Sequence, residues 1–317
     1  MHHIIRIYAQ NLKTQNHLKC NTSGIPSVLA VVSIILILFS ACGTNNHVNT
    51  TPLFWEISSD QNIIYALGSI HVAKEEIYPL SKTIMDAYDN SSCVVFERDI
   101  TSEQVSTPDR NIALSQIIDT DLYEQVFTRI KELYPSFPDE EIHSSSFYGI
   151  VELLMKTCYT EAKLSPENSI DIYFMNRALT DGKLVSGVES YAQAAEDLTH
   201  FPDAYYEYTL KALLDSKTYV DNVSLLFKDW CRGDLTAIES TQVQPLREAK
   251  DNSELERFLY EFSLVERNSR ITETFIDYLE SNQTTFFVIG VAHLVGDEGV
   301  ISQLEKSGYE IRLLDIT

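Results

Sequence analysis

The chain has 317 residues, with 24 lysines and arginines against 46 aspartates and glutamates, which gives a formal net charge of −22. Apolar residues make up 44% and charged residues 22%, an ordinary globular composition that excludes wholesale disorder and collagen-like or coiled-coil fibres. The acidic excess argues against nucleic-acid binding, because phosphate recognition needs a basic face.

Residues 1–41 are typical of a secretory signal. They hold three basic residues and no acidic residue, and the apolar run 28–39 leads into the small residues Ser40 and Ala41. This run is shorter than the roughly 20 residues that a spanning helix needs, so the pattern favours a cleaved signal over an uncleaved transmembrane anchor.

The segment from Leu38 to Cys42 resembles a bacterial lipobox, with Phe39 where leucine is usual. It predicts that Cys42 is lipidated, and that residues 42–52 are a lipidated cysteine and a polar, flexible tether. The protein is then expected at the extracytoplasmic face of the cell envelope, held to the membrane by its lipid. The alternative is an ordinary cleaved signal that happens to carry a cysteine.

From residue 53 onward, strands and helices alternate at both ends of the chain, with a largely helical block from about 112 to 279 between them. The pattern predicts a hairpin for the first two strands and a polar loop for residues 101–111. Strands are predicted at 53–58, 63–67, 92–96, 184–188, 284–289 and 309–314, and helices outside the block at 80–88 and 298–306. The pattern predicts an α/β fold over residues 53–317, with a parallel or mixed sheet flanked by helices and a large helical insertion.

An apolar strand that ends in Gly-x-x-His occurs twice, from Gly68 to His71 and from Gly290 to His293. A glycine lets the chain turn sharply at the end of a strand, and the histidine three residues later can point back over the edge of the sheet. Ligands of open α/β sheets bind beyond the carboxyl ends of the strands. The two related half-motifs therefore predict a site at this edge.

Two carboxylates follow strands at comparable places, Glu97 after the strand 92–96 and Glu189 after the strand 184–188. Two imidazoles and a carboxylate suit a borderline divalent metal such as Mn²⁺, Co²⁺ or Zn²⁺. Such an ion can lower the pKa of a bound water to about 7 and polarise a carbonyl. Glu97 is either a ligand or a general base. Taken singly, each histidine could instead be structural, and Glu97 a helix-capping or surface carboxylate.

Other catalytic and binding motifs are missing from the sequence. There is no His-Glu-x-x-His helix of the zincin type and no Gly-x-Ser-x-Gly nucleophile turn. Neither a Walker loop nor Gly-x-Gly-x-x-Gly is present, so nucleotide binding has no support.

Several segments resemble the TraB/GumN family, which includes the Tiki metalloproteases and is distantly similar to the erythromycin esterase/ChaN group. The resemblance covers essentially everything after residue 53. Its strongest elements are the two Gly-x-x-His motifs and the Glu-Arg-Asn segment. The matching segments are 65–72, 94–97, 171–190 with Gln193, 230–235, 266–268 and 290–296.

The resemblance implies a divalent-metal-dependent hydrolase with His71, His293 and Glu97 at the core of its site. Glu189 becomes a second acidic candidate. Arg267 becomes a charge partner for a substrate carboxylate or an orienter of Glu97, against the alternative of a helix-surface arginine. Asp171 is a weaker candidate, since an aspartate can simply cap the helix that it begins.

Three functions follow as hypotheses. The first is a lipid-anchored extracytoplasmic metal-dependent hydrolase, a peptidase acting on a peptide or protein substrate. The second is a non-catalytic lipoprotein that binds or sequesters peptides, as the pheromone-shutdown members of the TraB family suggest. The third is a non-enzymatic envelope protein with structural histidines.

Overall fold

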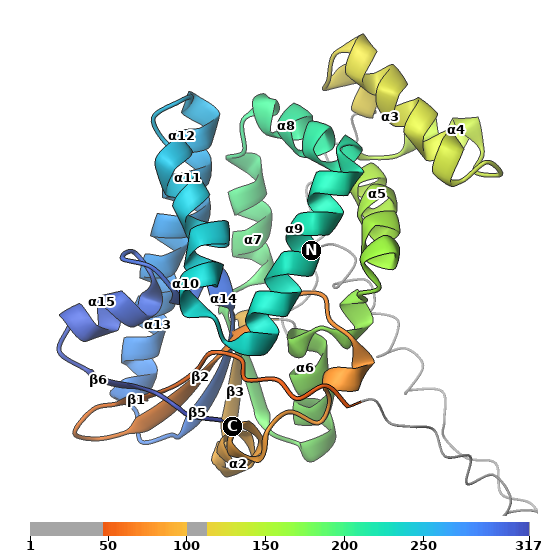
Figure 1. The fold of residues 1–317 in the computed structure, drawn as a ribbon. Helices are drawn as coiled ribbons and strands as arrows, with labels where there is room; N and C mark the ends of the chain where they lie inside the picture. The colour runs from red at the N-terminus through yellow and green to blue at the C-terminus, as the bar shows by residue number, and fades with distance from the viewer. Residues whose placement is uncertain (1–46, 100–112, 317) are drawn as a thin grey trace, which may run out of the picture.

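The computed structural model describes residues 47–99 and 113–316, so the predicted signal, Cys42 and the loop at 101–111 lie outside the described residues. Figure 1 shows a twisted sheet with helices packed on it and a group of helices beyond one of its edges. The strands are β1 (Phe54–Ser58), β2 (Ile63–Ser69), β3 (Cys93–Arg98), β4 (Leu184–Glu189), β5 (Thr285–Gly290) and β6 (Glu310–Leu313).

The helices up to residue 232 are α2 (Lys82–Asn90), α3 (Thr120–Leu133), α4 (Asp139–Ser144), α5 (Phe147–Ala162), α6 (Ile170–Asp181), α7 (Tyr191–Thr199), α8 (Asp203–Leu214) and α9 (Ser216–Arg232). Those after it are α10 (Leu235–Ile238), α11 (Gln244–Ala249), α12 (Glu254–Tyr260), α13 (Arg267–Leu279), α14 (Val291–Leu294) and α15 (Val300–Lys306). Short 3₁₀ turns are η1 (Glu75–Ile77), η2 (Leu114–Gln116) and η3 (Pro166–Asn168), and η4 (Glu239–Val243) and η5 (Glu261–Glu266) are π-helical.

The six strands form one mixed sheet in the order β4-β3-β5-β2-β1-β6. β2, β5, β3 and β4 run parallel to one another, whereas β1 is antiparallel to both β2 and β6. The predicted α/β class and the β1–β2 hairpin are therefore confirmed. Because four strands run the same way, their carboxyl ends share one edge of the sheet, and the predicted site residues follow these ends.

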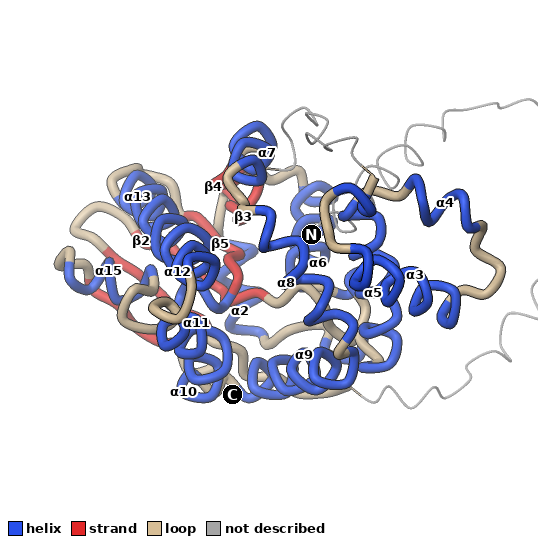
Figure 2. The backbone as a smooth tube through the Cα atoms, turned by 90° about the horizontal axis from the view of Figure 1, so that it is seen from above, coloured by secondary structure: helices blue, strands red, loops and turns tan. Residues whose placement is uncertain are grey.

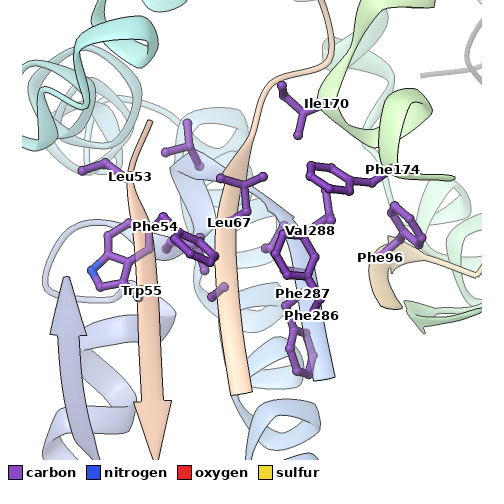
Figure 3. Packing of buried hydrophobic residues seen from close by; sticks show 14 of the residues in the cluster. Leu53, Phe54, Trp55, Leu67, Phe96, Ile170, Phe174, Phe286, Phe287 and Val288 are labelled. Carbon is purple, nitrogen blue, oxygen red and sulfur yellow. The ribbon is translucent and has the colours of Figure 1, made fainter. Parts of the chain in front are cut away.

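Both faces of the inner strands β3 and β5 are buried, as expected of parallel strands with continuous apolar sequences. Neighbouring residues of a strand point to opposite faces. Phe286 meets Phe174 of α6, with ring centroids 4.9 Å apart, and Phe287 meets Phe275 of α13, with centroids 3.9 Å apart. Figure 3 shows Phe174 and Phe286 among the packed side chains of this core.

The helical insertion has a second apolar core of its own, built from α3, α4, α5 and α8 around residues such as Val126, Ile150 and Leu210. Figures 1 and 2 show these helices grouped beyond the carboxyl edge of the strands, with α9 running back from them to the sheet. None of the helices within 47–99 and 113–316 has the length and apolarity needed to span a membrane.

The C-terminal end of α9 contacts the end of β2 and so connects the helical insertion to the sheet. The indole of Trp230, which is fully buried, donates from Nε1 to the carbonyl of Gly68 at 2.7 Å. Gly233 ends the helix in the left-handed region at φ +59°, and a Cβ there would lie 2.1 Å from the carbonyl oxygen of Thr51. This position therefore requires glycine. These contacts hold the first Gly-x-x-His segment against the helices above it.

Candidate functional site

Four of the predicted site residues converge at the carboxyl edge of the sheet. Glu97 ends β3, Glu189 ends β4, Arg267 begins α13 and His293 lies in the short helix α14. Arg267 donates from Nη2 to Glu97 Oε1 at 2.6 Å, and from Nε and Nη2 to the two oxygens of Glu189 at 2.8 and 3.0 Å. Its Nη1 lies 3.2 Å from His293 Nε2. We call these four residues the charged cluster.

Arg267 is thus no helix-surface arginine, because only 12% of its side chain is exposed and it bridges two buried carboxylates. Its planar guanidinium presents several donors in a fixed geometry, which suits it to hold two carboxylates at once. Arg267 therefore contacts Glu97 directly from the inner side of α13.

Burial and ion pairing set the charges of the cluster. Burial opposes the ionisation of Glu97 and Glu189, but the Arg267 guanidinium outweighs it and lowers the pKa of both carboxyls, that of Glu97 to well below 4.5. Burial likewise opposes the charge on Arg267, and the two carboxylates raise its pKa in compensation. Burial lowers the pKa of His293 to about 4, so this imidazole is neutral at neutral pH.

The hydrogen bonds of His293 identify which of its nitrogens carries the proton. Its Nδ1 lies 2.7 Å from Asn268 Oδ1, and the amide nitrogen of Asn268 donates to the Glu298 carbonyl at 2.8 Å. Because arginine only donates, His293 Nε2 must accept from Arg267, and Nδ1–H must donate to Asn268. His293 therefore points the lone pair of Nε2 into the charged cluster.

His71 belongs to a second polar pair at the same edge. Its Nδ1 lies 3.2 Å from Asp171 Oδ2, and Ser69 Oγ donates to Asp171 Oδ1 at 3.1 Å. Asp171 is not the cap of α6, because Ser169 fills that role by accepting from the amide of Ile172. Asp171 instead orients His71.

The His71 side chain is 44% exposed and stands outside the direct contacts of Arg267. Desolvation lowers the pKa of His71, but the Asp171 carboxylate outweighs it and raises the pKa above 6.5. The negative charge of Glu97 adds to the same upward shift of the His71 pKa.

The glycines of the two motifs have a different role from the sharp turn that the sequence suggests. Neither Gly68 nor Gly290 has a positive φ. A Cβ on Gly290 would lie 2.9 Å from Glu97 Oε2, which accepts a hydrogen bond from the Gly290 amide at 3.2 Å. A Cβ on Gly68 would lie 2.8 Å from Val291 Cγ2. Both positions need glycine because other groups approach the backbone closely.

Sequence reasoning missed two contributors. Asn268 was part of a matching segment but had no role assigned to it. Arg270 donates to Glu189 Oε1 at 3.1 Å and to Asp197 Oδ2 at 3.0 Å, so it extends the charged cluster toward α7. The spacing of Arg267 and Arg270, three residues apart on one helix, was the available signal, because such residues share a face.

The donor chemistry of His71, His293 and Glu97 fits a divalent metal. Each histidine is held through Nδ1 by a polar partner, the arrangement that orients metal-ligating imidazoles. In the side-chain positions of the described residues, however, no three His, Cys, Asp or Glu groups stand together as a metal-binding set. The guanidinium of Arg267 holds the carboxylate of Glu97 instead. Metal binding by His293 and Glu97 would require Arg267 to release both His293 Nε2 and Glu97 Oε1.

Fold and site together define an α/β protein with an ionised cluster at the carboxyl edge of its sheet, flanked by two Gly-x-x-His segments. The TraB/PrgY/gumN family model matches residues 53–313, and the chain belongs to this family.

Curated relatives carry metalloprotease names. The chain is 23% identical to a "Metalloprotease TIKI homolog" of Amphimedon queenslandica, over 92% of this chain and 68% of that protein. It is 21% identical to the homolog of Nematostella vectensis, over 78% of this chain and 64% of that protein. It is 22% identical to "Metalloprotease TIKI2" of Xenopus tropicalis, over 78% of this chain and 57% of that protein. The chain thus spans about two thirds of these relatives or less. No solved structure matches it significantly.

Proposed function

We propose that this protein is a metal-dependent hydrolase that cleaves peptide bonds in a peptide or protein substrate. The observation that carries the proposal is the pair of oriented histidines, each fixed through Nδ1, beside the ionised Glu97. The metalloprotease names of the relatives agree with it. His71, His293 and Glu97 would hold the ion, which is Mn²⁺, Co²⁺ or Zn²⁺ by donor type.

A divalent ion held there would supply a Lewis acid toward a peptide carbonyl. Glu189 keeps its negative charge through Arg267 and Arg270, and holds the guanidinium of Arg267 in place. Once Glu97 leaves its ion pair, Arg267 keeps free donors, which can bind a substrate carboxylate or the developing negative charge on a carbonyl oxygen.

The localisation belongs to the same proposal. Lipidation of Cys42 would anchor the domain at the extracytoplasmic face of the membrane, and residues 43–52 would serve as its tether. Cys42→Ser should then release the protein from the membrane fraction without altering its hydrolytic activity. Retention of that variant at the membrane would refute the lipid anchor.

Elemental analysis of the purified chain tests the metal site. We expect one divalent ion per wild-type chain after incubation with Mn²⁺, Co²⁺ or Zn²⁺, and loss of it in folded His71→Ala and His293→Ala. His200→Ala is the matched control, because His200 is an exposed histidine whose side chain hydrogen-bonds only the Glu196 carbonyl in the described part of the chain. Equal metal content in all four proteins would place the ion elsewhere.

A second candidate function is a non-catalytic lipoprotein that binds or sequesters peptides. The ion pair between Arg267 and Glu97 favours this binding function, because the guanidinium already neutralises the carboxylate without a metal. Mass spectrometry of peptides incubated with the protein separates the two functions. Cleaved products that disappear with His71→Ala support the hydrolase, whereas saturable binding without products supports the binding protein.

A further inference from the structure

A cavity of about 310 Å³ opens beside His71, between the helical block and the end of β2. We call it the His71 pocket. Figures 1 and 2 show that α5 and α9, which form one side of it, run close together. Residues on its wall include Ile70, Tyr159, Val223, Leu226, Phe227 and Gln242.

The wall of the His71 pocket is neutral and mostly apolar. Apart from His71, the side chains that line it are aliphatic, aromatic or uncharged amides. The hydroxyls of Tyr159 and Tyr219 lie 3.4 Å apart and hydrogen-bond each other, and burial raises the pKa of both, so neither is charged. A lysine, arginine or carboxylate side chain entering this pocket would lose water and find no charged partner other than His71.

The volume of the pocket limits the size of the group that it can bind. A volume of about 310 Å³ is near the lower end of the range for ligand pockets, which is roughly 300–1,000 Å³. It suits one large side chain rather than a long segment of peptide. Gln242 reaches the wall from the π-helical segment η4, an irregularity that is frequent at functional sites.

We propose that the His71 pocket binds a large apolar side chain of the peptide substrate, such as phenylalanine, leucine or methionine, next to the bond that is cleaved. This inference rests on the proposed function, because His71 is both a wall of the pocket and a proposed metal ligand. A substrate residue seated there would bring an adjacent peptide bond to the ion. The pocket would thereby select peptides by one side chain.

Cleavage of a peptide mixture by the metal-loaded full chain tests the specificity. We expect a large apolar residue at one fixed position beside the cleaved bond. Val223→Phe, which fills the pocket, should lower kcat/KM for such peptides about 10- to 200-fold and leave it unchanged for peptides with alanine there. Leu225→Phe is the matched control, because Leu225 lies on the same helix but is exposed and outside the pocket wall. Cleavage without side-chain preference, or equal cleavage by both variants, would overturn the inference.

A binding experiment separates failure of the pocket from failure of the hydrolase. N-acetyl-phenylalanine amide and N-acetyl-lysine amide are titrated into metal-free protein and followed by NMR. We expect the phenylalanine probe to bind wild type and Leu225→Phe but not Val223→Phe, and the lysine probe to bind none. If no peptide is cleaved with any metal, the proposed function fails, and this titration alone decides the pocket. Equal binding of both probes, or no binding to wild type, overturns it.

Discussion

Replacement of Arg267 by glutamine should destabilise the metal-free protein strongly. The side chains of Glu97 and Glu189 are only 8% and 2% exposed, so without the guanidinium two negative charges would face each other in a buried site. Removing one partner of a buried ion pair costs about 3–5 kcal/mol. Glu189 keeps Arg270 at 3.1 Å, so we expect a loss of about 3 kcal/mol in the free energy of unfolding, toward the lower end of this range.

Urea unfolding at neutral pH in the presence of a chelator measures this loss. Arg270→Gln is the matched control, because Arg270 is more exposed and Glu189 then retains Arg267. Asp197 loses this arginine but still accepts from Gln193, so the variant should cost clearly less than Arg267→Gln. Adding Glu97→Gln to Arg267→Gln should recover part of the loss, because groups in contact couple by about 0.5–3 kcal/mol. If Arg267→Gln stayed within about 1 kcal/mol of wild type, the guanidinium would not be what holds the carboxylates ionised, and the electrostatic reasoning would be wrong.

Three further predictions concern the same edge of the sheet. Asn268→Ala should weaken divalent-metal binding about 10- to 100-fold in calorimetric titration, because His293 loses its orienting partner, whereas the exposed neighbour variant Ser269→Ala should bind normally. Gly290→Ala should lower the free energy of unfolding by about 1–3 kcal/mol, because its Cβ meets Glu97 at 2.9 Å. Gly149→Ala should leave the free energy of unfolding unlowered, because its Cβ would have no contact closer than 3.7 Å. An equal loss in both variants would contradict the steric argument. Finally, the lowered pKa of Glu97 means that its ionised form stabilises the fold above about pH 4.5. The free energy of unfolding, measured in urea at decreasing pH, should therefore fall below this pH. A value that stayed constant would refute the conclusion that Glu97 is ionised in the folded protein.

Much of the sheet could be predicted because its inner strands are short continuous apolar runs. Cys93 to Phe96 and Phe286 to Ile289 are buried on both faces, and no helix of ordinary length fits such short runs. The parallel pairing follows from the helical segments that separate these strands. It brings the residues after each strand to one edge, which is why Glu97 and Glu189 were predicted as neighbours of a site.

The partners of Arg267 could not be predicted from the pattern. Regular helical spacing places Arg267 on the inward face of α13, because Ile271 and Phe275, four and eight residues later, are buried. The two carboxylates that it contacts, Glu97 and Glu189, are 170 and 78 residues away in the chain. The role of Asn268 depends on contacts with His293 and Glu298, which are 25 and 30 residues away in the chain. No local pattern contains this information.

The two separate apolar cores have a consequence for how such a protein can diversify. The charged cluster is built on the sheet, whose core includes Phe286 and Trp230, whereas Tyr159 and Tyr219 enter the His71 pocket from helices of the insertion. Substitutions within the insertion can reshape the pocket while leaving the ionised residues and their distances intact. If the proposed function holds, substrate preference can then change through the insertion, whereas His71, which belongs both to the pocket wall and to the proposed metal site, keeps the two linked.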